Sequence, residues 1–443
     1  MALATQFQHL IEDLQDPETL ARIHIFRERT IHCLILGEFT RGKEYVLETM
    51  VNYVALEMLL CKDADIGLWL VAGTLVQLAL SLGYHRDAQH FSSVSPFAGE
   101  MRRRVWAVVT QMDLRLSSQM GLPRLLKVHQ CDTAEPRNLL DTDFDEATVE
   151  LPQSRPETEF TPMLWILAKN RIDRISDLVS DFLADTCEHP YTAVIELDGK
   201  LEEAEASLPP IFRWQPLSQS FMVPPQVVMH RVWLQLAVPR LTIWLHRKYL
   251  SPSYTQADYK YSRNVCVQAG IKILEFQQLL DEEMRPDGLL YPVKWMITSL
   301  GQFIFLLGTS ILSYYVQLAK ARTDISVGQE TDTRVYNLLC STYPIWLRSS
   351  TVSREARQAA EHLSLLLGLQ EGTEDGIPPR EEFSEATTAA TPRFTIPFDQ
   401  VSWDTYQGKL DDIKALKPSP FSLPFLLHSL RDQKSETIYT ARS

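Results

Sequence analysis

Apolar residues recur along most of the chain at the three-to-four-residue spacing of amphipathic helices. Near the N-terminus, Phe7, Leu10, Ile11 and Leu14 follow this spacing and predict a helix over residues 6–30. Further helices are predicted over residues 43–61, 67–82, 96–120, 161–206, 226–249, 256–281, 290–321, 332–347 and 351–368. No stretch shows the strict alternation of a half-buried strand. The predicted fold class is therefore all-α, an irregular multi-helix bundle.

Three positions carry clear signals for helix ends. Gly83 follows the apolar run 67–82, where a glycine in the left-handed conformation commonly ends a helix. Ser95 and Pro96 have the residue types preferred at the N-cap and the first helical position. Gly121 then ends the helix that Pro96 begins.

Prolines and acidic residues mark the breaks between helices. Residues 123–160 are rich in both and predict an irregular segment that packs over the helices. The pairs Pro209-Pro210 and Pro224-Pro225 interrupt the helical pattern. Pro239 falls inside an apolar helix and predicts a kink there.

The composition is that of a soluble globular protein, with 45% hydrophobic and 22% charged residues among 443. The net charge of −13 argues against broad electrostatic affinity for nucleic acid. Residues 1–370 are predicted to form one helical body. Residues 371–443 are acidic with short aromatic islands and predict a largely disordered tail.

Two features bear on metal binding and membranes. The six cysteines show no C-x-x-C pair or other zinc-ligand spacing, so they predict separate thiols. Between Lys294 and Lys320 the chain has no charge and is long enough to span a membrane. Its Ser, Thr and Gln residues favour a buried core helix instead, and no membrane partner is expected.

The known catalytic motifs are absent. His85-Arg86-Asp87 spells the triplet of a kinase catalytic loop, but no D-F-G, glycine-rich loop or V-A-I-K accompanies it. G-x-S-x-G, H-E-x-x-H, P-loop and Rossmann patterns are also missing. We therefore predict no enzyme activity and no catalytic, cofactor or metal-binding residues.

Aromatic residues gather in the C-terminal helices and leave two interpretations open. They either fill the hydrophobic core or line a pocket for a small molecule between helices. The residues concerned are Trp233, Trp244, Trp295, Phe303, Phe305, Tyr314 and Tyr315.

Residues 67–143 carry several motifs in a fixed order. The first is the turn Gly83-Tyr84-His85-Arg86-Asp87. A proline-started helix follows, with the run Glu100-Met101-Arg102-Arg103-Arg104-Val105-Trp106. The last pattern consists of Asp132, Thr133, Pro136, Asn138 and Asp141. This order resembles the middle homology region of fungal zinc-cluster transcription factors, strongly over 67–143 and loosely over 60–330.

The resemblance implies a regulator of RNA polymerase II transcription that acts through a helical regulatory domain. It implies the nucleus as location, with the cytoplasm as the alternative. Implied partners are other transcription factors or coactivators, a small-molecule effector and a second copy of the chain. The sequence holds no zinc cluster, so zinc is expected only with an additional N-terminal segment, and autonomous DNA binding is not expected. The alternative is a helical body reused as an enzyme or small-molecule-binding protein of secondary metabolism.

The arginines of the second motif lie in the first turns of a helix, where the helix dipole disfavours cations. Pairing with the acidic residues of the irregular segment, Asp145 included, would offset this cost. We therefore predict a set of structural ion pairs that clamps this segment onto the helices. The candidate residues are Arg102, Arg103, Arg104, Asp132, Asp141 and Asp143.

Overall fold

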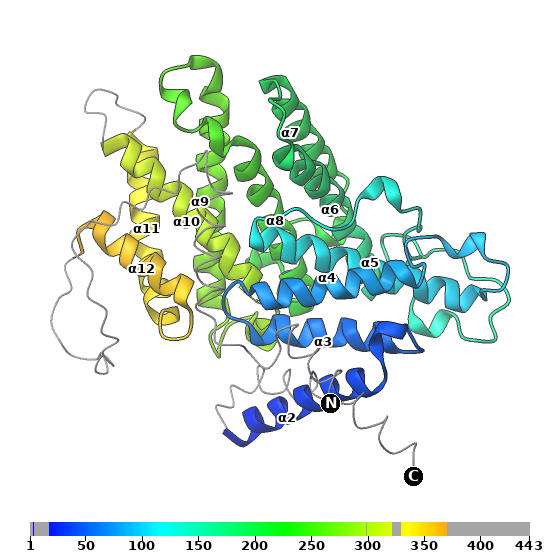
Figure 1. Cartoon of the computed structure of the whole chain (residues 1–443). Helices are drawn as coiled ribbons and strands as arrows, with labels where there is room; N and C mark the ends of the chain where they lie inside the picture. The colour runs from blue at the N-terminus through cyan, green and yellow to red at the C-terminus, as the bar shows by residue number, and fades with distance from the viewer. Residues whose placement is uncertain (1–2, 4–16, 298, 321–328, 370–443) are drawn as a thin grey trace, which may run out of the picture.

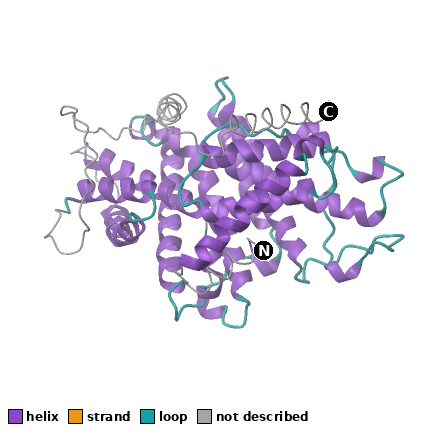
Figure 2. Ribbon diagram, turned by 60° about the horizontal axis from the view of Figure 1, so that its bottom comes forward, coloured by secondary structure: helices purple, strands orange, loops and turns teal. Residues whose placement is uncertain are grey.

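The computed structural model describes residues 3, 17–297, 299–320 and 329–369. All regular elements within these residues are helices, and no strand occurs among them (Figure 2). The all-α prediction is therefore confirmed. The predicted helix residues Phe7 to Leu14 and the predicted tail 371–443 lie outside the described residues.

The first group of helices forms one end of the molecule (Figure 1). Helix α3 lies between α2 and α4, and α5 packs on α4. Their apolar faces share one core, in which Val54, Leu75 and Val109 are completely buried. The helices are α2 (Pro17–Leu36), α3 (Val46–Leu60), α4 (Ile66–Ser81) and α5 (Pro96–Met120).

The middle of the chain forms a helical hairpin that packs against a central helix. Helices α6 (Pro162–Ala184) and α7 (Tyr191–Ala206) contact each other, and both contact α8 (Pro225–His246). The periodic region predicted over 161–206 is thus two helices, separated by residues 185–190. The prolines at 209–210 and 224–225 do interrupt helical structure, as predicted.

Helix α8 connects this hairpin to the largest core. It is buried along most of its length because α6 and α7 cover one side and α9 and α10 the other. The helix continues through Pro239. The remaining helices are α9 (Lys260–Glu283), α10 (Ser299–Lys320), α11 (Gln329–Ser349) and α12 (Arg354–Leu367).

Helix α10 is the apolar segment without charges. By length and composition it could cross a membrane, but 67% of its most apolar window is buried inside the protein. It contacts α8, α9, α11 and α12, which is the environment of a core helix. Phe305 and Tyr315 are buried in this core, and Trp233, Phe303 and Tyr314 pack against it. These aromatic residues therefore contribute to the core.

The predicted helix ends around α4 and α5 are confirmed. Gly83 has φ +72°, and the following Tyr84 N–H donates to the Ala79 carbonyl at 3.0 Å. The Ser95 hydroxyl accepts from the Ala98 N–H at 3.2 Å and caps α5. Gly121, with φ +65°, ends the same helix. The two caps of α5 therefore fix where the preceding segment ends and where the following segment begins.

A side chain from the loop between α3 and α4 holds the start of α12, far along the sequence. The Asp63 carboxylate accepts from the Ser353 hydroxyl, from the Arg354 N–H at 2.9 Å and from the Glu355 N–H at 3.3 Å. A negative charge at this position also compensates the helix dipole. Asp63 thus joins the N-terminal helices to the last described helix.

We expect the substitution Asp63→Ala to lower the free energy of unfolding by about 1–2 kcal/mol, the usual cost of losing a helix cap. Urea denaturation of the whole chain measures this change. Glu361→Ala, which removes an exposed acid from the same helix, serves as the control and is expected to change little. Equal free energies of unfolding for the two variants would contradict the role of Asp63 in holding the start of α12.

Candidate functional site

The turn after α4 is held by a buried ion pair between Asp87 and Arg103. Asp87 is 0% exposed, and its two oxygens accept from Arg103 Nε at 2.9 Å and Nη2 at 2.8 Å. The same oxygens accept from the N–H groups of Gln89 at 3.0 Å and Ala134 at 2.8 Å. One carboxylate therefore joins the turn, the first turns of α5 and the irregular segment.

Asp132 completes this connection from the other side. Its carboxylate accepts from the Asp87 N–H at 2.9 Å and from Arg86 at 3.2 Å, and it contacts His90 Nε2 at 3.1 Å. Its own N–H donates to the His85 carbonyl at 3.1 Å. The turn and the irregular segment are thus joined reciprocally, through side chains and backbone.

Arg104 binds a different part of the irregular segment. It donates to Glu100 one helical turn earlier at 3.2 Å, to Asp141 at 2.6 Å and to the Leu139 carbonyl at 3.0 Å. Glu100 is 0% exposed and also accepts from the Arg137 N–H at 3.1 Å. The guanidinium lies 4.8 Å from the centre of the Phe144 ring.

Arg102 contacts the end of α4. It donates to the Leu82 carbonyl at 3.1 Å and lies 4.1 Å above the Tyr84 ring. A Cβ atom at Gly83 would lie 3.7 Å from this guanidinium. Trp106, one turn further along α5, is 5% exposed and belongs to the core of α2–α5.

The structure corrects part of the predicted pairing. Of the four candidate acids, Asp141 alone hydrogen-bonds to an arginine of the α5 run. Asp143 instead pairs with Arg155 at 2.6 and 2.7 Å, and Asp145 accepts hydrogen bonds within its own turn. The arginines point in different directions from the helix, so each meets a different segment. The acceptors that the prediction missed are Asp87 and Glu100, both within the motifs already identified.

The electrostatic environment differs between these carboxylates. The hydrogen bonds from Arg103 hold the pKa of Asp87 well below its usual range. Arg155 likewise lowers the pKa of Asp143 to about 2. Burial raises the pKa of Glu100, against the opposing effect of Arg104. A charged Asp87 therefore stabilises the fold at neutral pH.

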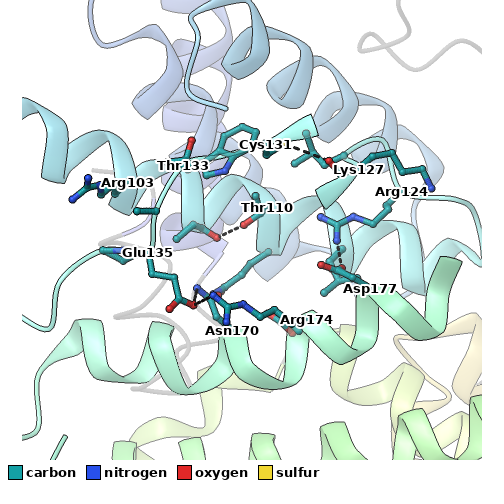
Figure 3. A pocket seen from close by; sticks show the side chains of 18 residues that line it. Arg103, Thr110, Arg124, Lys127, Cys131, Thr133, Glu135, Asn170, Arg174 and Asp177 are labelled. Atoms are coloured by element: carbon teal, nitrogen blue, oxygen red, sulfur yellow. Dashed lines mark hydrogen bonds and ion pairs between the residues drawn. The ribbon is translucent and has the colours of Figure 1, made fainter. Parts of the chain in front are cut away.

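A cavity of about 200 Å³ lies beside these contacts, between α5, α6 and residues 124–136 (Figure 3). Arg103, Thr110 and Gln111 line its α5 side, and Asp173 and Asp177 line its α6 side. The apolar part of the wall consists of Trp106, Ala107, Leu114, Leu126 and Pro136. Further polar and charged side chains line the cavity as well, among them Arg124, Lys127, Glu135, Asn170 and Arg174. The cavity thus combines charged groups with an apolar surface.

A buried network in α7–α9 contains the residue types of a catalytic triad. His246 Nδ1 lies 2.8 Å from the Ser262 hydroxyl, and Nε2 lies 3.4 Å from Asp198. Both His246 and Ser262 are 0% exposed. The Ser262 hydroxyl also lies 2.7 Å from the Tyr191 hydroxyl, and the α5–α6 cavity does not reach it. This buried network connects α7, α8 and α9.

The described residues contain no group of three or more His, Cys, Asp or Glu side chains that could hold a metal ion. The six cysteines are unpaired thiols, as expected from their spacing.

Comparison with known proteins identifies the family. Residues 56–206 match the fungal specific transcription factor domain. Transcription factor cghF of Chaetomium globosum is 43% identical over 417 residues, which cover 94% of this chain and 72% of that protein. The chain belongs to the fungal transcription factors with this domain.

Two further relatives carry descriptive names. The pyrrolocin cluster transcription factor fsdR of Fungal sp. (strain NRRL 50135) is 42% identical over 412 residues, covering 88% of this chain and 53% of that protein. The equisetin cluster transcription factor eqxF of Fusarium heterosporum is 42% identical over 378 residues, covering 83% of this chain and 54% of that protein. The chain spans about half the length of these two relatives. No solved structure matches the chain significantly.

The fungal specific transcription factor domain therefore includes the site described above. These relatives are named as transcription factors, and the interpretation of the chain as an enzyme has no support among them. The sequence resemblance to this family is confirmed, and the arginine clamp, defined as Arg103–Asp87 with Arg104–Glu100–Asp141, lies inside the matched residues.

We expect Asp87→Ala to lower the free energy of unfolding by about 3–5 kcal/mol, because it leaves Arg103 without its carboxylate in a buried site. Urea denaturation at neutral pH measures the effect. The control is Asp145→Asn, which changes an acid that bonds only within its own turn. A loss for Asp87→Ala no larger than for this control would contradict the central role of the pair.

Proposed function

We propose that this protein regulates transcription by RNA polymerase II from the genes of a biosynthetic cluster in a fungal nucleus. The observation that carries the proposal is the identity of more than 40% that extends over most of the chain to named cluster regulators. Those names describe the clusters that the relatives are named for. For this chain we propose a target of the same kind, namely a group of biosynthetic genes.

The helical body is proposed to act by presenting a fixed surface to partner proteins. The arginine clamp supports this role because the buried, bidentate Arg103–Asp87 pair also accepts from the Ala134 N–H of the irregular segment, and Arg104 donates to Asp141 and to the Leu139 carbonyl of the same segment. An irregular segment held in this way offers backbone and side-chain groups in one arrangement. Other transcription factors or coactivators are the partners that we propose.

We propose that the 443 residues of this chain do not themselves recognise specific DNA sequences. The sequence contains no zinc cluster of cysteines, and its net charge is −13. Binding to the phosphate backbone depends on clustered Lys and Arg. In the arginine clamp these cations are already paired with carboxylates.

Deletion of the gene is expected to change the transcripts of a contiguous group of biosynthetic genes several-fold, because relatives are named for such clusters. RNA sequencing of the deletion strain and its parent measures this. Reintroducing the chain with Asp145→Asn should restore the pattern, whereas Asp87→Ala should not, since it disrupts the clamp. An unchanged transcriptome would refute the proposed function.

The purified chain is expected to show no sequence-selective DNA binding. A gel-shift titration at several salt concentrations compares DNA from the promoters of the affected genes with scrambled DNA. Specific regulators typically prefer their site by about 10³–10⁷-fold. We expect equal, weak and salt-sensitive affinities for the two DNAs. A preference for the promoter DNA in that range would assign DNA recognition to this polypeptide.

A further inference from the structure

A group of cations lies inside the protein where α5, α6 and α8 meet. We call Arg115 on α5, Lys169 on α6 and Arg240 on α8 the cation cluster. Asp173, one turn after Lys169 on α6, attracts all three, and its carboxylate lies 2.6 Å from Lys169 Nζ. Among the described residues, Asp173 is the one carboxylate that acts on the two arginines. Three positive side chains therefore share one negative partner.

The cluster is largely removed from water. Lys169 is 8% exposed and Arg240 is 5% exposed. The Nε atoms of Arg115 and Arg240 are buried and have no hydrogen-bond partner among the described residues. Water can do little to screen the repulsion between these cations, and buried charges without sufficient partners are costly.

Arg231 on the same helix as Arg240 shows how this chain satisfies a buried arginine by hydrogen bonds alone. Arg231 is 4% exposed. It donates to the Ile211 carbonyl at 2.8 Å, to Gln215 at 3.1 Å and to Ser220 at 3.3 Å. Burial alone therefore does not explain the unmatched donors of the cation cluster.

The surrounding helices do not balance the excess of positive charge. The next acid on α6, Asp177, pairs with Arg124 instead. Helix α7 meets α6 through a shared apolar core. The charged groups that face Lys169 are therefore Asp173 on its own helix and the two arginines of the cluster on α5 and α8.

Lys169 is the member of the cluster that can relieve this excess. A guanidinium stays protonated in proteins, whereas a lysine amine loses its proton readily when it is buried. Burial, followed by the charge of Arg115, lowers the pKa of Lys169 to about 7, against the attraction of Asp173. Burial lowers the pKa of Arg240 only to about 10, so this arginine remains charged at neutral pH. Release of one proton to water turns Lys169 into a neutral amine and leaves two cations beside one carboxylate.

We propose that the cation cluster is a pH-sensitive contact that sets how tightly α6 packs against α5 and α8. While Lys169 is a neutral amine, the three helices pack closely around two arginines and one carboxylate. Uptake of a proton by Lys169 restores the third positive charge, and the repulsion loosens α6. The proposal concerns the folded chain and holds whether or not the chain regulates transcription.

Helix α6 also holds the irregular segment, so a change in its packing extends beyond the cluster. Three ion pairs connect α6 to residues 124–135 of that segment. They are Arg124–Asp177, Lys127–Asp181 and Arg174–Glu135. A looser α6 therefore gives this part of the irregular segment less support.

The sign of the pH effect follows from the difference between the folded and the unfolded chain. An unfolded lysine keeps the ordinary pKa of 10.5, whereas the pKa of folded Lys169 is about 7. Folding therefore releases a proton between about pH 7 and pH 10.5, and the folded state gains stability as the pH rises through this window. The gain is lost as the pH falls towards 7, and below about pH 6 Lys169 causes no further change.

Urea denaturation of the full chain at pH 6.5 and pH 8.5 tests the proposal. The titration of Lys169 should make the folding equilibrium constant about 20-fold larger at pH 8.5 than at pH 6.5. Lys169→Met, which keeps the length of the side chain and removes its amine, should lose this rise. Lys200→Met, at an exposed lysine of α7, is the matched control and should keep it. An equal rise in Lys169→Met and the wild type would overturn the proposal.

Two further substitutions should move the midpoint of the pH dependence in opposite directions. Arg240→Leu removes a cation that opposes protonation of Lys169, so the midpoint should shift to higher pH. Asp173→Asn removes the carboxylate that favours the charged amine, so the midpoint should shift to lower pH. A purely structural cluster would change the stability of both variants and leave the midpoint in place, and this result would overturn the proposal.

Amide hydrogen exchange of the full chain measures whether α6 itself loosens. After correction for the intrinsic pH dependence of exchange, protection of residues 162–184 in α6 should fall more than that of residues 46–60 in α3 when the pH is lowered from 8.5 to 6.5. Lys169→Met should not show this difference between the two helices. Equal changes of protection in α6 and α3 of the wild type would overturn the proposed loosening of α6.

Discussion

The buried pair between Asp87 and Arg103 is the interaction on which the arrangement of the first half of the fold depends. A carboxylate with no exposed surface must have its charge matched and its oxygens bonded. Here the turn after α4, the start of α5 and the segment at residue 134 each supply part of that match. None of the three can move without leaving the charge unsatisfied, which is why one residue fixes an irregular segment that has no regular backbone pairing.

Local signals in the sequence were sufficient to define the helices around this site. Ser95, Pro96 and Gly121 act within one turn of their own positions, so residue type alone predicts their roles. The partners of the arginines depend on how distant segments fold back. Arg104 reaches Asp141, whereas Asp143 two residues later faces Arg155. The spacing of these acids along the chain does not indicate which arginine each of them meets.

In the middle of the chain, the sequence likewise does not reveal which residues are buried between distant helices. The apolar pattern of 226–249 predicts a helix, yet it does not reveal that α8 is covered on both sides by separate cores. Arg240 follows Pro239 and precedes Leu241 in this apolar stretch. A cation within such a helix indicates a buried charge, but Arg231 in the same stretch gives the same signal and meets quite different partners. The residues of α5 and α6 that act on Arg240 lie 64 or more positions away in the sequence and follow only from the packing.

Helix α5 contributes to both the clamp and the cavity, so the contacts that hold the irregular segment also shape the hollow beside it. Arg103 pairs with Asp87 and also lines the cavity, together with Thr133 and Ala134 of that segment. The Ala134 N–H donates to the same Asp87 carboxylate that Arg103 binds. Moving residues 133–134 away from α5 would therefore open the cavity wall and also remove a hydrogen bond from a fully buried carboxylate. The shape of the cavity thus depends on the same charge that fixes the irregular segment.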